Sequence, residues 1–245
     1  RSTHNLTTTY AYDALGRMVS MQDARGGIYS RGYDEYGRVA WESDPATNGT
    51  WYAYDALGRQ TAVTNALGHV VETAYDAEDR VVATWGATYP VAYDYDDYGR
   101  MTSMYTYRGS GEIATQSQIT NLKSQMDLTR WLYEDATGVL TNKVYADGKG
   151  PSYTYTPDGK LATRAWARGS VASYAYDASG LLTGVDYSDD TPDIAYTYDR
   201  LGRQLSAASS VSTNLFEYDG LDLVAETQNG IVIDRATDAL GRAAG

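Results

Sequence analysis

Tyrosine followed by aspartate is the commonest pairing in this sequence that could do chemistry. It occurs at Tyr12-Asp13, Tyr33-Asp34, Tyr54-Asp55 and at several later positions. An aromatic ring can stack on a sugar while a neighbouring carboxylate accepts hydrogen bonds from the sugar's hydroxyl groups. This pairing is therefore compatible with a carbohydrate-binding surface. In the other interpretation the tyrosine packs and the aspartate caps a turn. The sequence favours the structural role, because the pair recurs with turn residues behind it.

Metal and catalytic candidates are few. The acidic patch Asp94 to Gly99 has the Asp and Gly spacing of a calcium loop, but Tyr105 stands where such a loop needs its twelfth, acidic residue. The second acidic loop, Asp186 to Asp193, is more typical of a solvated turn. His4 and His69 stand in no triad or metal-ligand spacing, and the chain has no cysteine and no glycine-rich phosphate loop. We therefore predict no catalytic residue, no metal site and no cofactor.

The charge and hydrophobicity of the sequence limit the kinds of partner that the chain can bind. The 245 residues include 20 Lys and Arg against 32 Asp and Glu, a net charge of −12, without a basic run. This balance argues against nucleic acid or an anionic membrane as a partner. No apolar run approaches the roughly 18 residues that would span a bilayer. The 24 tyrosines beside a single phenylalanine remain to be explained.

Internal repetition of the sequence explains the large number of tyrosines. The string YDALGR at Tyr12 returns in related forms at Tyr33, Tyr54 and Tyr75, each 21 residues after the one before. Variants continue from Tyr95 to the TDALGR string at 237–242, so that about eleven copies of 19 to 22 residues cover the chain as a single array, 1–245. The repeat residues that we predict to be structural are Tyr12, Asp13, Gly16, Arg17, Tyr33, Asp34, Gly37, Arg38, Tyr54, Asp55, Gly58, Arg59, Tyr75, Asp76, Arg80, Tyr95, Asp96, Gly99, Arg100, Tyr176, Asp177, Gly180, Tyr198, Asp199, Gly202 and Arg203.

Each repeat predicts a β-hairpin. In Asp13-Ala14-Leu15-Gly16 the aspartate opens a four-residue turn and the glycine supplies the left-handed backbone that closes it, as in a type I turn with a bulge. Tyr10 and Tyr12 are two residues apart and share one face of a strand. A second turn recurs between repeats, as at 23–26 and 65–68. Two turns per repeat predict about 22 short strands in one antiparallel meander, which must curl because open sheets rarely exceed about ten strands.

The repeat also predicts contacts between neighbouring copies. Tyrosines on every second strand would form an aromatic column on one sheet face, and their hydroxyls would tolerate water. The arginine after the turn glycine, as at Arg17 and Arg38, would either stack on a tyrosine of the next repeat or pair with the aspartate of its own turn. The sequence leaves these two alternatives open.

The recurring YD and GR strings resemble the YD repeats of the Rhs family, and the resemblance covers nearly the whole chain. It implies a β-strip that spirals into a hollow shell. In bacterial polymorphic toxins and toxin complexes such shells enclose a toxic polypeptide, and in teneurins a similar shell is a cell-surface scaffold. The resemblance therefore implies a portion of a larger, secreted or surface-exposed protein.

The segment 106–132 departs from the repeat. Ile119, Leu122 and Met126 have the spacing of one helical face. We expect either a short helix within 113–127 or a degenerate strand pair in which Gln116 takes the place of a repeat tyrosine. The two alternatives have equal support.

These observations predict an all-β fold, an antiparallel meander of tandem hairpins curling into a spiral strip or partial shell. The predicted function is that of a non-catalytic structural module in a shell or scaffold, with a carbohydrate-binding adhesin surface as the alternative. The expected partners are neighbouring repeats of the same larger chain and an enclosed toxin polypeptide, or carbohydrate in the adhesin alternative, with no nucleic acid and no membrane span.

Overall fold

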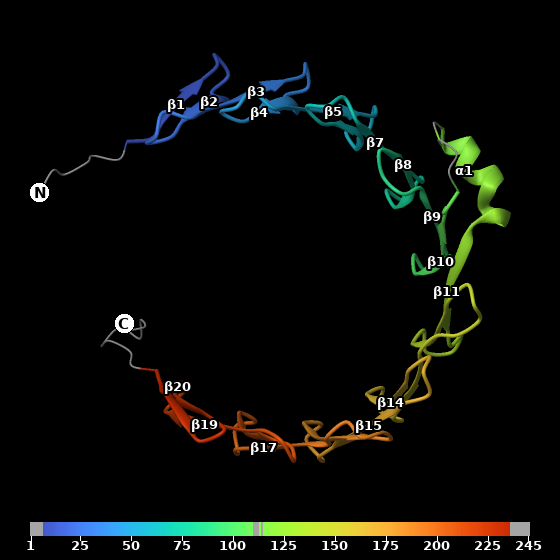
Figure 1. The fold of residues 1–245 in the computed structure, drawn as a ribbon, viewed down its shortest axis with the longest axis vertical. Coiled ribbons are helices and arrows are strands. Elements are labelled where there is room, and N and C mark those ends of the chain that lie inside the picture. The colour runs from blue at the N-terminus through green and yellow to red at the C-terminus, as the bar shows by residue number, and fades with distance from the viewer. Residues whose placement is uncertain (1–6, 110–112, 114, 236–245) are drawn as a thin grey trace, which may run out of the picture. The chain divides into compact units, whose positions relative to one another are not determined.

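The computed structural model describes residues 7–109, 113 and 115–235. Within them lie 21 β-strands, one α-helix and one 3-10 helix. From β1 to β11, and again from β12 to β21, each strand pairs antiparallel with the next along the chain. Figure 1 shows the strands following one another in chain order within each unit. The predicted all-β meander of tandem hairpins is therefore confirmed. Residue contacts divide the chain into two compact units, residues 1–130 and 131–245.

The first unit contains ten complete strands and both helices. Its strands are Thr9–Tyr12 (β1), Met18–Gln22 (β2), Ile28–Tyr33 (β3), Val39–Ser43 (β4), Gly49–Tyr54 (β5), Gln60–Thr64 (β6), Val70–Tyr75 (β7), Val81–Gly86 (β8), Val91–Tyr95 (β9) and Met101–Thr106 (β10). The helices are Gln116–Leu122 (α1) and the 3-10 helix Lys123–Gln125 (η1). β11 (Asp127–Tyr133) begins in this unit and ends in the next.

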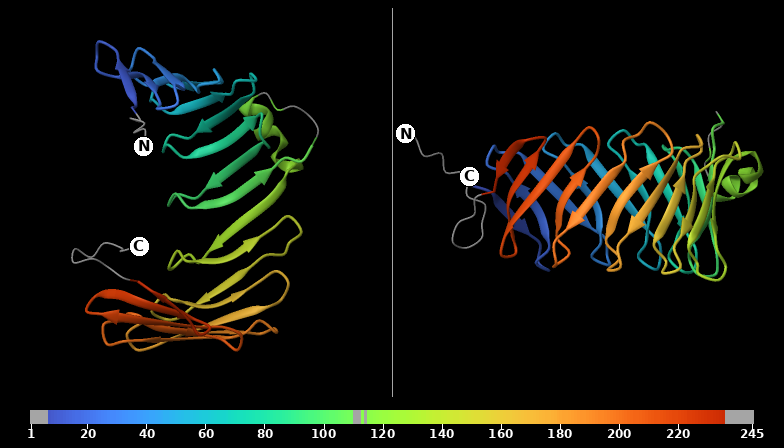
Figure 2. Two further views of the ribbon diagram at one scale, coloured as in Figure 1. Left: turned by 60° about the vertical axis from the view of Figure 1, so that its left-hand side comes forward. Right: turned by 90° about the horizontal axis from the view of Figure 1, so that it is seen from below.

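The second unit repeats the same hairpins. Its strands are Leu140–Val144 (β12), Ser152–Tyr155 (β13), Leu161–Ala165 (β14), Val171–Tyr176 (β15), Leu182–Tyr187 (β16), Ile194–Tyr198 (β17), Gln204–Ala208 (β18), Thr213–Asp219 (β19), Asp222–Gln228 (β20) and Ile231–Asp234 (β21). Within each unit the strands lie side by side and the turns line both edges of the strip, as Figure 2 shows.

Turn chemistry fixes the hairpins. The N–H of Gly16 donates to the carbonyl oxygen of Asp13 at 3.0 Å, and the N–H of Asp13 donates to that of Arg17 at 2.9 Å. Gly16 has φ +77°, a left-handed conformation that glycine adopts without a steric cost. The pairing of β1 with β2 shifts register at Tyr12. These features make the type I turn with a bulge that the sequence predicts.

The irregular segment forms a helix rather than a degenerate strand pair. Thr115 caps α1 and exchanges hydrogen bonds with Gln118 in a capping box. Gln116, the residue considered as a replacement for a repeat tyrosine, is the first residue of this helix. Ile119 and Met126, two residues of the predicted helical face, are buried. The helical alternative is thus the one that the structure contains.

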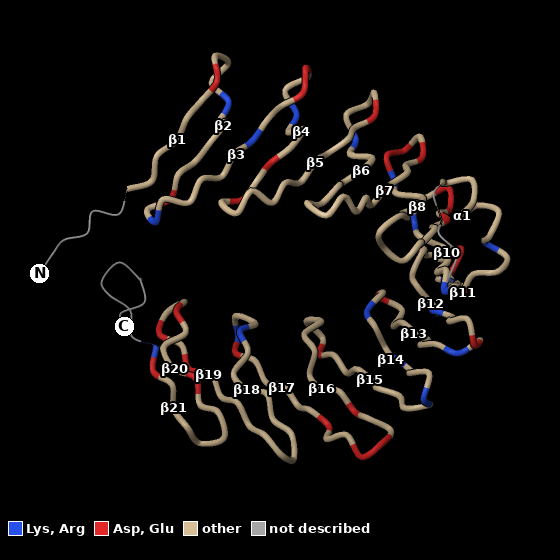
Figure 3. Tube along the Cα trace, turned by 45° about the horizontal axis from the view of Figure 1, so that its top comes forward, with Lys and Arg blue, Asp and Glu red and all other residues tan. Residues whose placement is uncertain are grey.

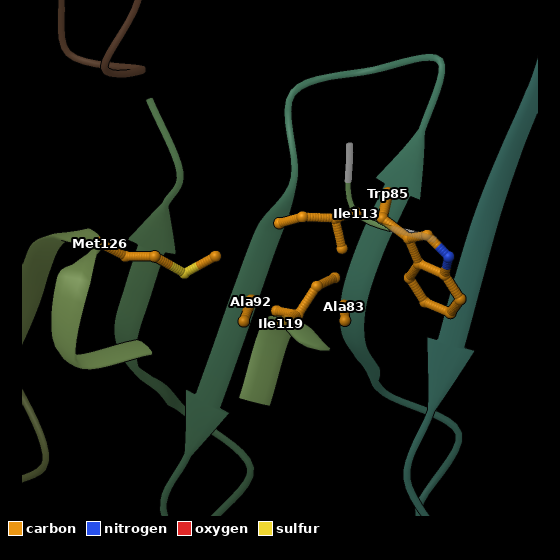
Figure 4. Packing of buried hydrophobic residues seen from close by; sticks show 6 residues of the cluster. All are labelled: Ala83, Trp85, Ala92, Ile113, Ile119 and Met126. Atoms are coloured by element: carbon orange, nitrogen blue, oxygen red, sulfur yellow. The ribbon is translucent and has the colours of Figure 1, made fainter. Parts of the chain in front are cut away.

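The helix buries the main hydrophobic cluster of the first unit. Ile119 is 1% exposed and packs with the small residues Ala83 and Ala92 of β8 and β9 (Figure 4). Ala74 of β7 packs against the same cluster. We call the sheet surface that carries these alanines and α1 the helix face. Because successive strand residues alternate between faces, Tyr75 and its repeat equivalents lie on the opposite surface, which we call the tyrosine face.

Candidate functional site

In six repeats the turn aspartate is held at both carboxylate oxygens. In the third repeat, Oδ1 of Asp55 accepts the N–H groups of Leu57 at 3.0 Å and Arg59 at 2.9 Å, and Oδ2 accepts Nε–H of Arg59 at 2.7 Å. Figure 3 shows the acidic residues gathered at such turns. Backbone and guanidinium hydrogen bonds of this kind recur at Asp13, Asp34, Asp76, Asp96 and Asp199.

These hydrogen bonds change the acidity of the aspartates. The backbone N–H of Arg17 is the main cause of the lowered pKa of Asp13, and the Arg17 guanidinium contributes as well. At Asp55, burial opposes the change, but the hydrogen bonds from Arg59 outweigh it and the pKa is lowered. The carboxylates are thus stabilised in the charged form that the turn requires.

The repeat arginine joins its own turn to the following repeat. While Nε of Arg59 binds Asp55, an Nη of the same guanidinium donates to the carbonyl oxygen of Asp76 at 2.7 Å. The guanidinium carbon also lies 4.9 Å from the ring centroid of Tyr75. Both alternatives left open by the sequence therefore occur together on one side chain. The same stacking on the next repeat's tyrosine is made by Arg17, Arg38, Arg80 and Arg203.

The repeat arginine contacts the following repeat, whereas the repeat tyrosine contacts the preceding one. The hydroxyl of Tyr54 donates to the carbonyl oxygen of Val39, the residue after Arg38 in the preceding repeat, at 2.8 Å. Equivalent bonds of 2.8 to 3.0 Å are made by Tyr33, Tyr75, Tyr95, Tyr155, Tyr176, Tyr198 and Tyr218. Together with the arginine bonds, we call these the inter-repeat contacts.

The hydroxyl bond explains the excess of tyrosine over phenylalanine more directly than tolerance of water does. A phenylalanine at Tyr54 would pack its ring under the arginine but leave the carbonyl of Val39 without this donor. The sequence expectation lacked this contact. The signal that could have revealed it is the near absence of phenylalanine at a position that otherwise asks only for an aromatic ring.

Some repeats keep only part of the pattern. Tyr176, Asp177 and Gly180 keep the turn, with Gly180 at φ +84°, but Leu181 replaces the arginine. Asp79 replaces the turn glycine of the fourth repeat and adopts φ +64°. Tyr12, in the first described strand, is 60% exposed. The last predicted copy, 237–242, lies outside the described residues.

The other candidates for chemistry do not come together. Asp94, in the calcium-like patch, accepts a hydrogen bond from Lys123. The backbone of His69 belongs to a turn closed by Asn65, and His4 lies outside the described residues. In the described part of the chain, no group of three or more acidic or histidine side chains is arranged to hold a metal ion. Among the same residues, no helix is long and apolar enough to cross a membrane.

Replacing Tyr54 by phenylalanine tests the hydroxyl contact. We expect the free energy of unfolding to fall by about 0.5–1.5 kcal/mol, because the ring remains while one hydrogen bond to a backbone carbonyl is lost. Urea denaturation followed by circular dichroism measures the change. The matched control is Tyr36→Phe, because Tyr36 is 76% exposed at a turn. A loss at Tyr54 no larger than at Tyr36 would show that the hydroxyl bond adds nothing.

The comparisons with known proteins agree with this geometry. The family model of the RHS Repeat matches residues 2–28, 33–70 and 54–90. Residues 2–28 and 33–90 carry RHS repeats. A Photorhabdus luminescens Tc holotoxin pore has a similar fold, with a TM-score of 0.57 and 18% identity over 96% of this chain and 15% of that one. A TcdB2-TccC3-Cdc42 crystal structure aligns with 98% of this chain and 18% of that one, at 15% identity and a TM-score of 0.42.

The chain thus has a fold similar to the matched part of the Tc holotoxin pore structure. The chain spans less than a fifth of the length of either matched chain. No curated protein matches its sequence.

Proposed function

We propose that this chain is a segment of the wall of a larger shell, in a secreted or cell-surface protein of the toxin-complex type, and that the shell encloses a polypeptide. The observation that carries the proposal is the series of inter-repeat contacts. Neighbouring repeats are bound to one another by tyrosine bonds and, in several repeats, arginine bonds to backbone carbonyls, as at Tyr54 and Arg59. A strip joined in this way can extend as a wall without needing a second sheet to cover it.

The burial pattern supports a wall. Most strand residues are half-buried, and the largest fully buried side chain is that of Ile119, beneath α1. A globular enzyme of this length would bury a continuous core and place catalytic groups above it. Here the titratable residues of the repeats serve turns and inter-repeat contacts, which supports a non-catalytic role.

Limited proteolysis of the whole protein that carries these repeats tests the proposal. We expect a non-repeat polypeptide to resist proteinase K under native conditions and to be degraded once the protein is unfolded in urea. A protease site inserted in the exposed turn at 188–191 serves as the control and should be cut in the native protein. If the non-repeat regions are cut as fast as this turn, the protein is an open scaffold and encloses nothing.

A further inference from the structure

A cavity on the helix face of the first unit is lined in part by Asp55, Arg59 and Tyr75, which make turn and inter-repeat contacts. Glu72 and Trp85, which also line it, make none of those contacts. Its floor follows one line across four strands, in which Ala53 of β5 lies opposite Ala62 of β6, Ala62 opposite Glu72 of β7, and Glu72 opposite Trp85 of β8. Gln116, the first residue of α1, also lines the cavity, whose volume is about 420 Å³. This volume lies within the range of small ligand sites.

Two neighbouring polar side chains of the cavity have no hydrogen-bond partner in the part of the chain that the structure describes. Trp85 is 8% exposed, and its indole nitrogen is buried without a hydrogen-bond acceptor among the described residues. Figure 4 shows that this nitrogen lies on the side of the ring away from Ile113 and Ala83. The carboxylate of Glu72 forms no hydrogen bond or ion pair with any other described residue. Because a buried donor without an acceptor is costly, the pair provides a reason for a ligand to bind.

The chemistry of the pair selects the ligand. An indole N–H donates only and a carboxylate accepts only, and direct cross-strand partners have Cβ atoms about 5 Å apart. A primary carboxamide matches such a pair, because its oxygen accepts from Trp85 while its NH₂ group donates to Glu72. We propose that this cavity binds a partner polypeptide by the carboxamide of an asparagine or glutamine side chain.

Two observations favour a polypeptide over a sugar. The ring of Trp85 packs in the same cluster as Ile113 and Ile119, so its flat face is not free to stack on a pyranose. The cavity also continues the cluster in which Ile119 of α1 and Ile113 cover the sheet, since Trp85 belongs to both. The methyl groups of Ala53 and Ala62 offer the aliphatic part of a bound segment an apolar floor.

The inference does not rest on the proposed enclosure. Arg59 and Tyr75 also line the cavity, but the Glu72 and Trp85 side chains that would hold the ligand belong to the helix face and make none of the inter-repeat contacts. Failure of either proposal therefore leaves the other standing.

A titration of the ¹⁵N-labelled chain followed by NMR tests the site. The probe is the peptide Ac-Ala-Gln-Ala-NHMe, and the matched control peptide carries methionine in place of glutamine. We expect the glutamine peptide to shift the indole resonance of Trp85 at millimolar concentration, and the methionine peptide to leave it in place. Methyl α-glucoside, the sugar alternative, should also leave it in place.

Variants then separate the two polar groups. Glu72→Ala and Trp85→Phe should each weaken peptide binding at least tenfold, the second being followed at the backbone amide of Ala62. Glu72→Gln, which keeps an acceptor oxygen, should stay within about threefold of the original chain. Trp41→Phe is the matched control, because Trp41 is outside the cavity lining. Equal shifts with both peptides, a response to the glucoside alone, or no response to the glutamine peptide would overturn the proposal.

Discussion

Replacing Ile119 by alanine is expected to lower the free energy of unfolding of the first unit by about 2–4 kcal/mol. Ile119 is 1% exposed and is the residue through which α1 packs on Ala83 and Ala92. Truncation loses the transfer free energy of the removed methyl and methylene groups and leaves a cavity that a rigid sheet beneath a short helix fills poorly. Urea denaturation followed by circular dichroism gives the free energy. Hydrogen exchange should show the lost protection concentrated in β8 and β9.

The matched control is Thr120→Ala on the same helix, because Thr120 is exposed. It should change the free energy of unfolding by no more than about 0.5 kcal/mol. If Ile119→Ala were as stable as this control, the packing of α1 would add no stability to the sheet.

The repeat unit was predictable because its signals are local. The aspartate and glycine of each turn specify its backbone, and a fixed period of about 21 residues carries that specification along the chain. Strand alternation then places Tyr10 and Tyr12 on one face. None of these steps needs knowledge of how distant residues meet.

Contacts that depend on the register of strand pairing were harder to predict from the sequence. The bulge at each turn shifts the pairing by one residue, and this shift decides that the Tyr54 hydroxyl meets the carbonyl of Val39. Likewise, Glu72 and Trp85 are 13 positions apart in the sequence and become neighbours only through the register of β7 with β8. The cavity between them therefore has no counterpart in any sequence motif.

The short helix could be predicted only in part from the sequence. The spacing of Ile119, Leu122 and Met126 contains the helical signal, but a degenerate repeat fitted the 21-residue period equally well. Packing of Ile119 on Ala83 and Ala92 and the cap at Thr115 favour the helix. Tertiary contact, rather than intrinsic propensity, stabilises a helix of only seven residues.

Acidification should unfold the chain through its turns. The folded state lowers the pKa of Asp13, Asp34, Asp55, Asp76, Asp96 and Asp199, and holds that of Asp158 and of Asp189 at about 2. In the unfolded chain these groups titrate near pH 4. A lowered pKa contributes stability that is present above pH 4 and is lost as the pH falls through the folded value. We therefore expect Tm to change little between pH 7 and pH 5 and to fall steeply from about pH 4 to pH 2.

Substituting two turn aspartates distinguishes the contribution of the turns to acid unfolding from that of the net charge of the chain. In Asp55→Asn/Asp76→Asn the amide oxygens can still accept the backbone N–H groups, as Asn65 does at 3.0 Å in its own turn, but they no longer titrate. This double variant should have a lower Tm at pH 7, because each arginine loses its charged partner, and a shallower decline below pH 4. Thermal unfolding followed by circular dichroism across the pH range measures both. An unchanged slope would mean that acid acts through the net charge of the chain rather than through these turn aspartates.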